Sequence, residues 1–290
     1  MPHFERDNAS LYYEETGSGE PILTNHGVSE NASYWSRPGV TARLAERYRV
    51  ISMDMRGHAR SRVRGEPTGY DVETVADDIG ALADHLGLER FHLLSHATGG
   101  MAAIRYAMHH SDRLLSLMAT DTGSATLPID EIAEHTDPDQ VYERIDISQN
   151  PMAQTYATLG WDEILAGARV DPGPFLNRLD ANPDPERVWR EVEDVLRMSD
   201  TKTLAEFMGS FYDDPDPRIA KLREIRCPVL ILLGEHDVMF VKPSEQLARE
   251  IPRAKHVVMK GLGHMTAIED PEWTARELLE FLDEVGAARS

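Results

Sequence analysis

The feature that most constrains the fold is a regular alternation of short apolar segments with amphipathic helical ones. Residues 49–55, 91–95 and 114–120 read RVISMDM, FHLLS and LLSLMAT, which are apolar runs without a clean period of two. Residues 70–86 instead place apolar side chains three and four positions apart and are followed by Gly87, as is typical of a helix and its stop. Apolar strands that alternate with helices predict a parallel sheet covered by helices on both faces.

The same alternation resumes toward the C-terminus. Residues 228–237 and 256–264 each indicate a strand followed by a loop, and residues 244–251 between them indicate a helix. Asp270 and Pro271 then offer a capping side chain and a first-turn proline, so a final helix is expected to begin there. This alternation of strands and helices therefore predicts an α/β protein.

The sequence pattern changes between residues 124 and 216, where strand-like runs stop and short helical segments take their place. Asp-Pro pairs interrupt these segments. Examples are Asp137-Pro138, Asp171-Pro172 and Asp184-Pro185. We expect residues 124–216 to form a helical cap inserted into a core made of residues 1–123 and 217–290. The bulky apolar side chains of this cap indicate an apolar or aromatic ligand, and Trp161 is the candidate contact. These side chains include Met152, Leu159, Trp161 and Phe175.

Charge and composition exclude several classes of partner. The 290 residues include 30 Lys and Arg against 50 Asp and Glu, a formal net charge of −20, so nucleic acid and anionic membrane are not expected partners. No window is apolar enough for a membrane span, and the first residues, MPHFERDN, do not resemble a signal peptide. With Cys227 as the single cysteine we expect a cytoplasmic protein, and no clustered ligands indicate a metal.

Residues 93–103, LLSHATGGMAA, combine a strand, a small-residue turn and a helix start. This is the arrangement of a nucleophile elbow, whose usual text is G-x-S-x-G. Ser95 occupies the position of the first glycine and Gly99 that of the second. The nucleophile position is Ala97, whose side chain cannot attack a substrate.

Three candidate site residues each follow an apolar strand: Ala97, Asp237 and His264. Because the carboxyl ends of parallel strands share one edge, these positions can converge. In such a site His264 would move the proton of an attacking hydroxyl, and Asp237 would fix the tautomer of the imidazole. Backbone N–H groups of Thr98 and Val28 would stabilise the oxyanion.

Taken together, these motifs make the chain resemble the α/β-hydrolase superfamily, as a member with a helical cap. The matching text is NHGVSENASYW, DMRGHARS, SHATGG, LLGEHD and GLGH, in this order. The resemblance implies an eight-stranded, mostly parallel sheet and hydrolysis of a small ester, lactone, thioester or amide without a cofactor. Some members carry the acid after an earlier strand, where this chain has Asp121; we favour Asp237 because G-E-H-D matches the acid loop better.

The chain departs from the family at Ala97, and three accounts of this residue stay open. It can be a Ser→Ala substitution in a working hydrolase, which would leave the protein inactive or nearly so. It can mark a natural ligand-binding protein, or an enzyme that works from His264 and Asp237 alone, such as a cofactor-free dioxygenase. We favour the first account, with an ester or lactone that has an apolar or aromatic portion as substrate. Hydrolytic carbon–carbon cleavage is the enzymatic alternative, and the sequence leaves the oligomeric state open.

Overall fold

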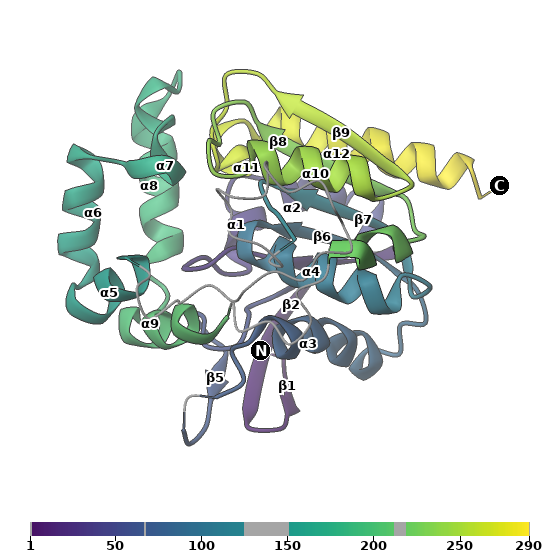
Figure 1. Cartoon of the computed structure of the whole chain (residues 1–290), viewed down its shortest axis with the longest axis horizontal. Coiled ribbons are helices and arrows are strands. Elements are labelled where there is room, and N and C mark those ends of the chain that lie inside the picture. Colours follow the sequence, from purple (N-terminus) through teal and green to yellow (C-terminus); the bar gives the residue numbers. More distant parts are fainter. Residues whose placement is uncertain (1, 67, 125–150, 212–218, 290) are drawn as a thin grey trace.

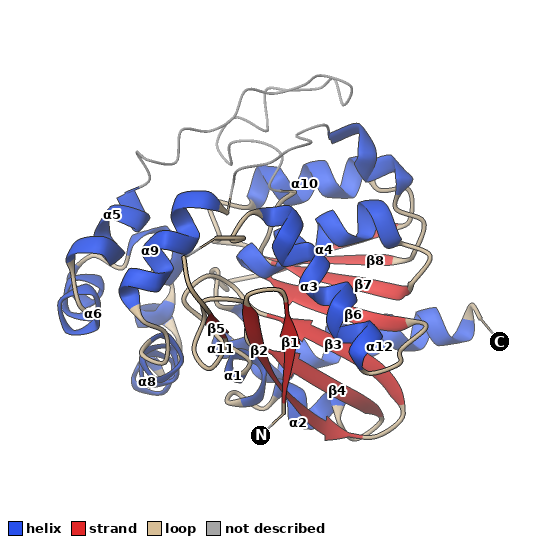
Figure 2. Cartoon of the chain, turned by 90° about the horizontal axis from the view of Figure 1, so that it is seen from below, coloured by secondary structure: helices blue, strands red, loops and turns tan. Residues whose placement is uncertain are grey.

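The computed structural model describes residues 2–66, 68–124, 151–211 and 219–289, and one large sheet organises them (Figures 1 and 2). Along the sheet the strands follow the order β1-β2-β4-β3-β6-β7-β8-β9. Neighbours from β4 through β9 are parallel, whereas β1 and β4 pair antiparallel with β2. The expected eight-stranded, mostly parallel sheet is therefore confirmed, and the short strand β5 adds a ninth by pairing with β2. The strands are β1 His3–Arg6, β2 Ala9–Gly17, β3 Glu20–Asn25, β4 Tyr48–Met53, β5 Arg62–Val63, β6 Phe91–His96, β7 Leu114–Thr120, β8 Val229–Gly234 and β9 Ala254–Met259.

Helices cover both faces of the sheet, as the apolar strands require (Figure 2). One face carries α3 Val72–His85, α4 Ala97–His110 and α10 Val241–Glu250. The other carries α1 Ser33–Ser36, α2 Val40–Leu44, α11 Thr266–Glu269 and α12 Pro271–Ala287. Two separate clusters of buried apolar side chains lie between the sheet and its two layers of helices, one on each face.

Strand β6 lies in the middle of the sheet, between β3 and β7, and all its residues are buried. Its last residues pair in register with its neighbours: Ser95 lies opposite Asn25 and Ala119, and His96 lies opposite Thr120. The ends of these three strands are therefore level. Whatever follows β6 emerges at the centre of the carboxyl edge, where α/β proteins place their sites.

Every described element between β7 and β8 is helical; helices α5 to α9 lie beside the carboxyl edge of the sheet (Figure 1), whereas η3 packs against α4 and α10. The helices are α5 Pro151–Thr158, α6 Trp161–Val170, α7 Gly173–Leu176, η2 Leu179–Ala181, α8 Pro185–Leu196, α9 Thr201–Ser210 and η3 Ile219–Glu224. The Asp184-Pro185 pair begins α8, where the Asp184 side chain accepts a hydrogen bond from the Arg187 N–H. This pair therefore starts a helix rather than interrupting one. Residues 125–150, including the Asp137-Pro138 pair and part of the expected cap, lie outside the described residues.

The helix starts predicted from the sequence agree with the structure to within three residues. Asp270 caps α12 by accepting a hydrogen bond from the Trp273 N–H, and Asp71 caps α3 in the same way through the Thr74 N–H. The short helices α1, α2 and α11 have too few residues for a helical period, so no pattern in the sequence indicated them.

Candidate functional site

The turn between β6 and α4 has a left-handed residue at its centre. Ala97 adopts a φ of +47°, which a residue with a Cβ atom rarely adopts and which costs about 1 kcal/mol. The hydroxyl of Thr122 donates a hydrogen bond of 2.6 Å to the Ala97 carbonyl oxygen and so holds the turn. The backbone thus has the strained geometry that presents a nucleophile in an elbow, although the side chain is a methyl group.

The two glycines after Ala97 let the turn pack closely against its neighbours. A Cβ atom on Gly99 would lie 2.2 Å from the carbonyl oxygen of His26, and one on Gly100 would lie 2.6 Å from the hydroxyl oxygen of Thr122. Both approaches are shorter than any van der Waals contact. The text A-T-G-G therefore has a steric cause: helix α4 can begin here only if its third and fourth residues have no side chain.

His264 and Asp237 are hydrogen-bonded, as the sequence predicted. His264 Nδ1 lies 2.7 Å from Asp237 Oδ2, and both side chains are buried. Burial alone would lower the pKa of His264. The Asp237 carboxylate outweighs it through its charge and hydrogen bond, with help from Glu30 and Glu269, so the pKa is raised above 6.5. The ring of Phe240 stacks on the imidazole, with centroids 5.5 Å apart, and fixes its plane.

Asp121, the alternative acid, does not face His264. Its carboxylate accepts hydrogen bonds from the Gly234 N–H at 2.8 Å and the Thr266 hydroxyl at 2.6 Å. Complete burial and the nearby Asp237 raise its pKa well above the usual value, which favours the neutral form. Asp121 therefore ties the end of β8 to α11 and leaves Asp237 as the partner of the imidazole.

Glu269 holds the loop that carries His264, a role that the sequence did not indicate. One carboxylate oxygen accepts from the Gly263 N–H at 2.8 Å, and the other accepts from the Met265 N–H at 3.1 Å. These residues flank His264, so one side chain fixes the backbone on both sides of the imidazole. The only sequence signal is an acid five residues after the histidine, which is too common to indicate such a clamp.

A second loop, between β3 and α1, faces the elbow. The Gly27 N–H donates a hydrogen bond of 2.6 Å to Glu30 Oε2, which folds the loop into a tight turn around Val28. Val28 and Thr98 both border the cavity described below, and neither amide N–H has a hydrogen-bond partner within the described residues. The cavity wall thus contains two residues, Val28 and Thr98, whose amide N–H groups have no hydrogen-bond partner within the described part of the chain.

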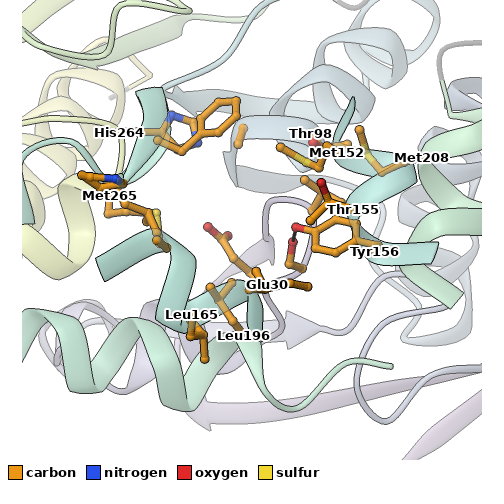
Figure 3. Close-up of a pocket in the computed structure, with 18 of the residues that line it drawn as sticks. Glu30, Thr98, Met152, Thr155, Tyr156, Leu165, Leu196, Met208, His264 and Met265 are labelled. Carbon is orange, nitrogen blue, oxygen red and sulfur yellow. Dashed lines mark hydrogen bonds between the residues drawn. The ribbon is translucent and has the colours of Figure 1, made fainter. Parts of the chain in front are cut away.

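A cavity of about 320 Å³ joins these parts (Figure 3). Its walls are predominantly apolar with a few polar groups, which is typical of a site for a small, largely apolar molecule. Trp161 is part of the wall, as expected, together with Met152 and Phe175. Leu159 does not line it and is 39% exposed, so the expectation for this residue was wrong: it follows the last turn of α5, on the solvent side. The lining residues are Val28, Ser29, Glu30, Ala97, Thr98, Pro151, Met152, Thr155, Tyr156, Trp161, Ile164, Leu165, Ala168, Pro172, Phe175, Leu176, Leu196, Met208, Phe240, His264 and Met265.

Neighbouring hydroxyl groups do not replace the missing one. Ser95 is completely buried within β6 and is not part of the cavity wall. Thr98 borders the cavity, but it lies one residue into α4, beyond the strained position. Ser29 hydrogen-bonds the Tyr156 hydroxyl. Within the part of the chain that the structure describes, no group of His, Cys, Asp and Glu could hold a metal ion. None of the helices described is long and apolar enough to cross a membrane.

The fold and the site together define a class of protein. A mostly parallel sheet carries a strained strand-to-helix turn at its centre, and a histidine that is hydrogen-bonded to an aspartate borders the same cavity as that turn. The sequence model of the family described as the alpha/beta hydrolase fold matches residues 20–271, and the chain belongs to this family.

Individual relatives cover nearly the whole chain at low identity. A non-heme haloperoxidase of Rhodococcus erythropolis is 26% identical, over 96% of this chain and 97% of its own. A thermophilic esterase from Thermogutta terrifontis is 25% identical with a TM-score of 0.69, over 96% of this chain and 94% of its own. The enol-lactonase from Burkholderia xenovorans has a TM-score of 0.77 at 21% identity, over 97% of this chain and all of its own.

Proposed function

We propose that this site binds a carboxylic ester or a lactone with an apolar or aromatic portion. It is a serine-type hydrolase site in which alanine occupies the nucleophile position. The observation that carries the proposal is the left-handed Ala97, which lines the same cavity as His264, the hydrogen-bond partner of Asp237. A strained φ costs stability, and a methyl group gains nothing from it. The strained backbone at position 97 is explained if it serves to present a side-chain hydroxyl group to a substrate.

With a serine at position 97, the site would contain a chemical group for each step of ester hydrolysis. The hydroxyl oxygen would attack the acyl carbon while His264 takes its proton, and Asp237 would stabilise the resulting imidazolium. The N–H groups of Val28 and Thr98 would hold the oxyanion, and His264 would then protonate the leaving alkoxide. Water would release the acyl group by the same steps. Because every proton and charge has a side chain or amide to receive it, the proposal needs neither cofactor nor metal.

The substrate class follows from the cavity and from the relatives. The cavity offers a few polar groups, among them Glu30, Thr98 and His264, and a predominantly apolar wall that includes Trp161 and Phe175. An ester carbonyl fits the former and an apolar or aromatic portion fits the latter. The esterase from Thermogutta terrifontis, which is similar over nearly the whole chain, supports an ester as the reacting group.

We further propose that residues 124–216 are a cap inserted between the core segments 1–123 and 217–290. Support comes from the helical structure of its described part and from the cavity wall that Trp161 and Phe175 contribute. The lone buried thiol of Cys227 fits the cytoplasm, where disulfides are rare. The net charge of −20 argues against nucleic acid as a partner and leaves a small molecule.

Turnover by the Ala97→Ser variant tests the proposal. A panel of phenyl esters and lactones is followed by pH-stat with the unaltered chain, with Ala97→Ser, and with Ala97→Ser combined with His264→Ala. We expect hydrolysis by the single variant alone, since losing the serine costs a serine protease about a million-fold in kcat. If Ala97→Ser folds and is as inert as the unaltered chain on every substrate, the hydrolase proposal fails. A ligand-binding protein, or an enzyme that uses His264 and Asp237 alone, would then be the better account.

A further inference from the structure

Glu30 is a carboxyl group in the cavity wall to which the mechanism above gives no role. The residue is only 3% exposed, although it borders the cavity. Figure 3 shows it pointing from its loop into the space between His264 and Tyr156. A buried carboxyl group is costly unless it is paired or neutral, so its presence among apolar walls requires an explanation.

The two oxygens of Glu30 have different surroundings. Oε2 accepts the hydrogen bond of 2.6 Å from the Gly27 N–H. Oε1 lies 3.2 Å from His96 Nε2, yet that nitrogen has no hydrogen-bond partner among the described residues. Oε2 is therefore fixed by the backbone, and Oε1 is available to a ligand.

The Glu30 carboxyl group also lies close to the nucleophile position. A Cβ atom on Gly27 would lie 3.0 Å from the Ala97 Cβ and 3.0 Å from Glu30 Oε2. Both atoms therefore flank the same point of the turn that precedes Val28. A carbonyl group held by the amides of Val28 and Thr98 would have its oxygen in this same region.

The surroundings of Glu30 favour its neutral form. Burial raises its pKa to about 8, and the backbone hydrogen bond and the charge of His264 offset only part of this effect. The other titratable groups that face it are His96 on β6, Tyr34 on α1 and Tyr156 on α5. Burial lowers the pKa of His96 and raises that of both tyrosines, so all three are neutral near pH 7. His264 differs from these three groups, because the Asp237 carboxylate raises its pKa and favours the charged imidazolium.

We propose that Glu30 is a third hydrogen-bond donor of this site, a neutral carboxylic acid that donates from Oε1 to the ligand's carbonyl oxygen beside the amides of Val28 and Thr98. This role rests on the proposed hydrolase function, in which that oxygen gains negative charge. A neutral acid stabilises such an oxygen, whereas a carboxylate at the same place repels it. A carboxylic acid kept neutral by an apolar site is an effective oxyanion donor in enzymes.

Binding of two matched probes tests this role without any turnover. Acetophenone carries a carbonyl group, and ethylbenzene has nearly the same shape without one. The fluorescence of Trp161, in the cavity wall, reports their dissociation constants at pH 6.5 and 9.5. The measured quantity is the ratio of the two constants, because apolar contributions cancel in it.

We expect the unaltered chain to prefer acetophenone about three- to tenfold more at pH 6.5 than at pH 9.5, the value of one neutral hydrogen bond. Glu30→Gln, whose amide still donates, should keep the preference at both pH values, and Glu30→Leu should lack it at both. A ratio independent of pH in the unaltered chain overturns the proposal, and that measurement needs no variant. A pH-dependent ratio that persists in Glu30→Gln also overturns it and assigns the effect to His264.

The outcome is separable from that of the hydrolase proposal. If Ala97→Ser is inert while the ratio depends on pH through Glu30, the donor role stands and the hydrolase proposal fails. If Ala97→Ser hydrolyses esters while the ratio is independent of pH, the hydrolase proposal stands and Glu30 is no donor.

Discussion

Gly234 lies so close to the carbonyl oxygen of Gly263 that the end of strand β8 has no space for a side chain. A Cβ atom on Gly234 would lie 1.8 Å from the carbonyl oxygen of Gly263. The loop that carries Asp237 begins at the first of these glycines, and His264 directly follows the second. Their contact therefore sets the distance between the two loops, on which the His–Asp hydrogen bond depends.

Gly234→Ala should destabilise the protein strongly, because the new methyl group meets backbone that cannot rotate away. We expect a loss of about 2 to 3 kcal/mol or more in the free energy of unfolding. Gly167→Ala is the matched control: Gly167 is exposed within α6 with no atom within 4 Å of its Cβ position. That change should be neutral or stabilise by up to about 1 kcal/mol. Urea denaturation measures both, and equal stabilities would show that the contact is not close.

Asp237→Asn and Asp121→Asn separate the two candidate acids when each is combined with Ala97→Ser. Asp237→Asn removes the charge that orients and stabilises the imidazolium, so kcat should fall about a thousandfold or more. Asp121 favours its neutral form, and an amide can still accept a hydrogen bond from Gly234, so its replacement should cost less than about tenfold. The reverse order of effects would assign the acid to Asp121.

Glu30 should make the protein less stable as pH rises. Its pKa is about 8 in the folded chain against 4.5 in the unfolded chain. Between these values the unfolded chain has released the proton and the folded chain retains it, so the free energy of unfolding falls by about 1.4 kcal/mol per pH unit. Relative to the unaltered chain, Glu30→Gln should therefore gain about 2 to 3 kcal/mol between pH 5.5 and 7.5. Urea denaturation at both values checks this, and a constant difference would place an ionised Glu30 in the folded protein.

Trp161→Ala should weaken the binding of aromatic ligands, because the indole forms part of the cavity wall and donates a hydrogen bond of 2.7 Å to the Ser199 carbonyl oxygen. We expect the dissociation constant of phenyl acetate to rise about tenfold or more in the Ala97 background. Leu159→Ala is the control, since this side chain lies outside the cavity. Calorimetric titration measures both variants, and equal constants would show that the cap does not enclose the ligand.

The sheet and the three positions Ala97, Asp237 and His264 could be predicted from the sequence. Each of these positions follows a strand, and in a parallel sheet the direction of the strands determines the edge at which their last residues lie. Strands that are apolar on both faces must be buried, and their carboxyl ends must meet at one edge. Ala97 could be recognised despite its missing hydroxyl, since Gly99 and Gly100 are required by contacts with backbone and Thr122 that do not involve that hydroxyl.

Glu30 and Glu269 could not be predicted, because their roles depend on the direction of a side chain in a loop. Each folds back onto backbone N–H groups within six residues, and neither carries a periodic signal. Leu159 likewise shows that the direction of a side chain could not be predicted from the sequence. Its apolar character suggested a cavity wall, but position relative to α5 decides whether a residue faces the ligand or solvent, and composition does not contain that information.

The most direct test of the central claim is covalent labelling of Ala97→Ser with a phenyl phosphonofluoridate, read out by intact mass and by peptide mapping. This reagent reacts with a serine that a base and an oxyanion site activate, so it tests the elbow, His264 and the amides together without knowledge of the substrate. The account predicts one phosphonyl group on Ser at position 97, none on the unaltered chain, and little on Ala97→Ser combined with His264→Ala. An Ala97→Ser protein that folds normally yet stays unlabelled would contradict it.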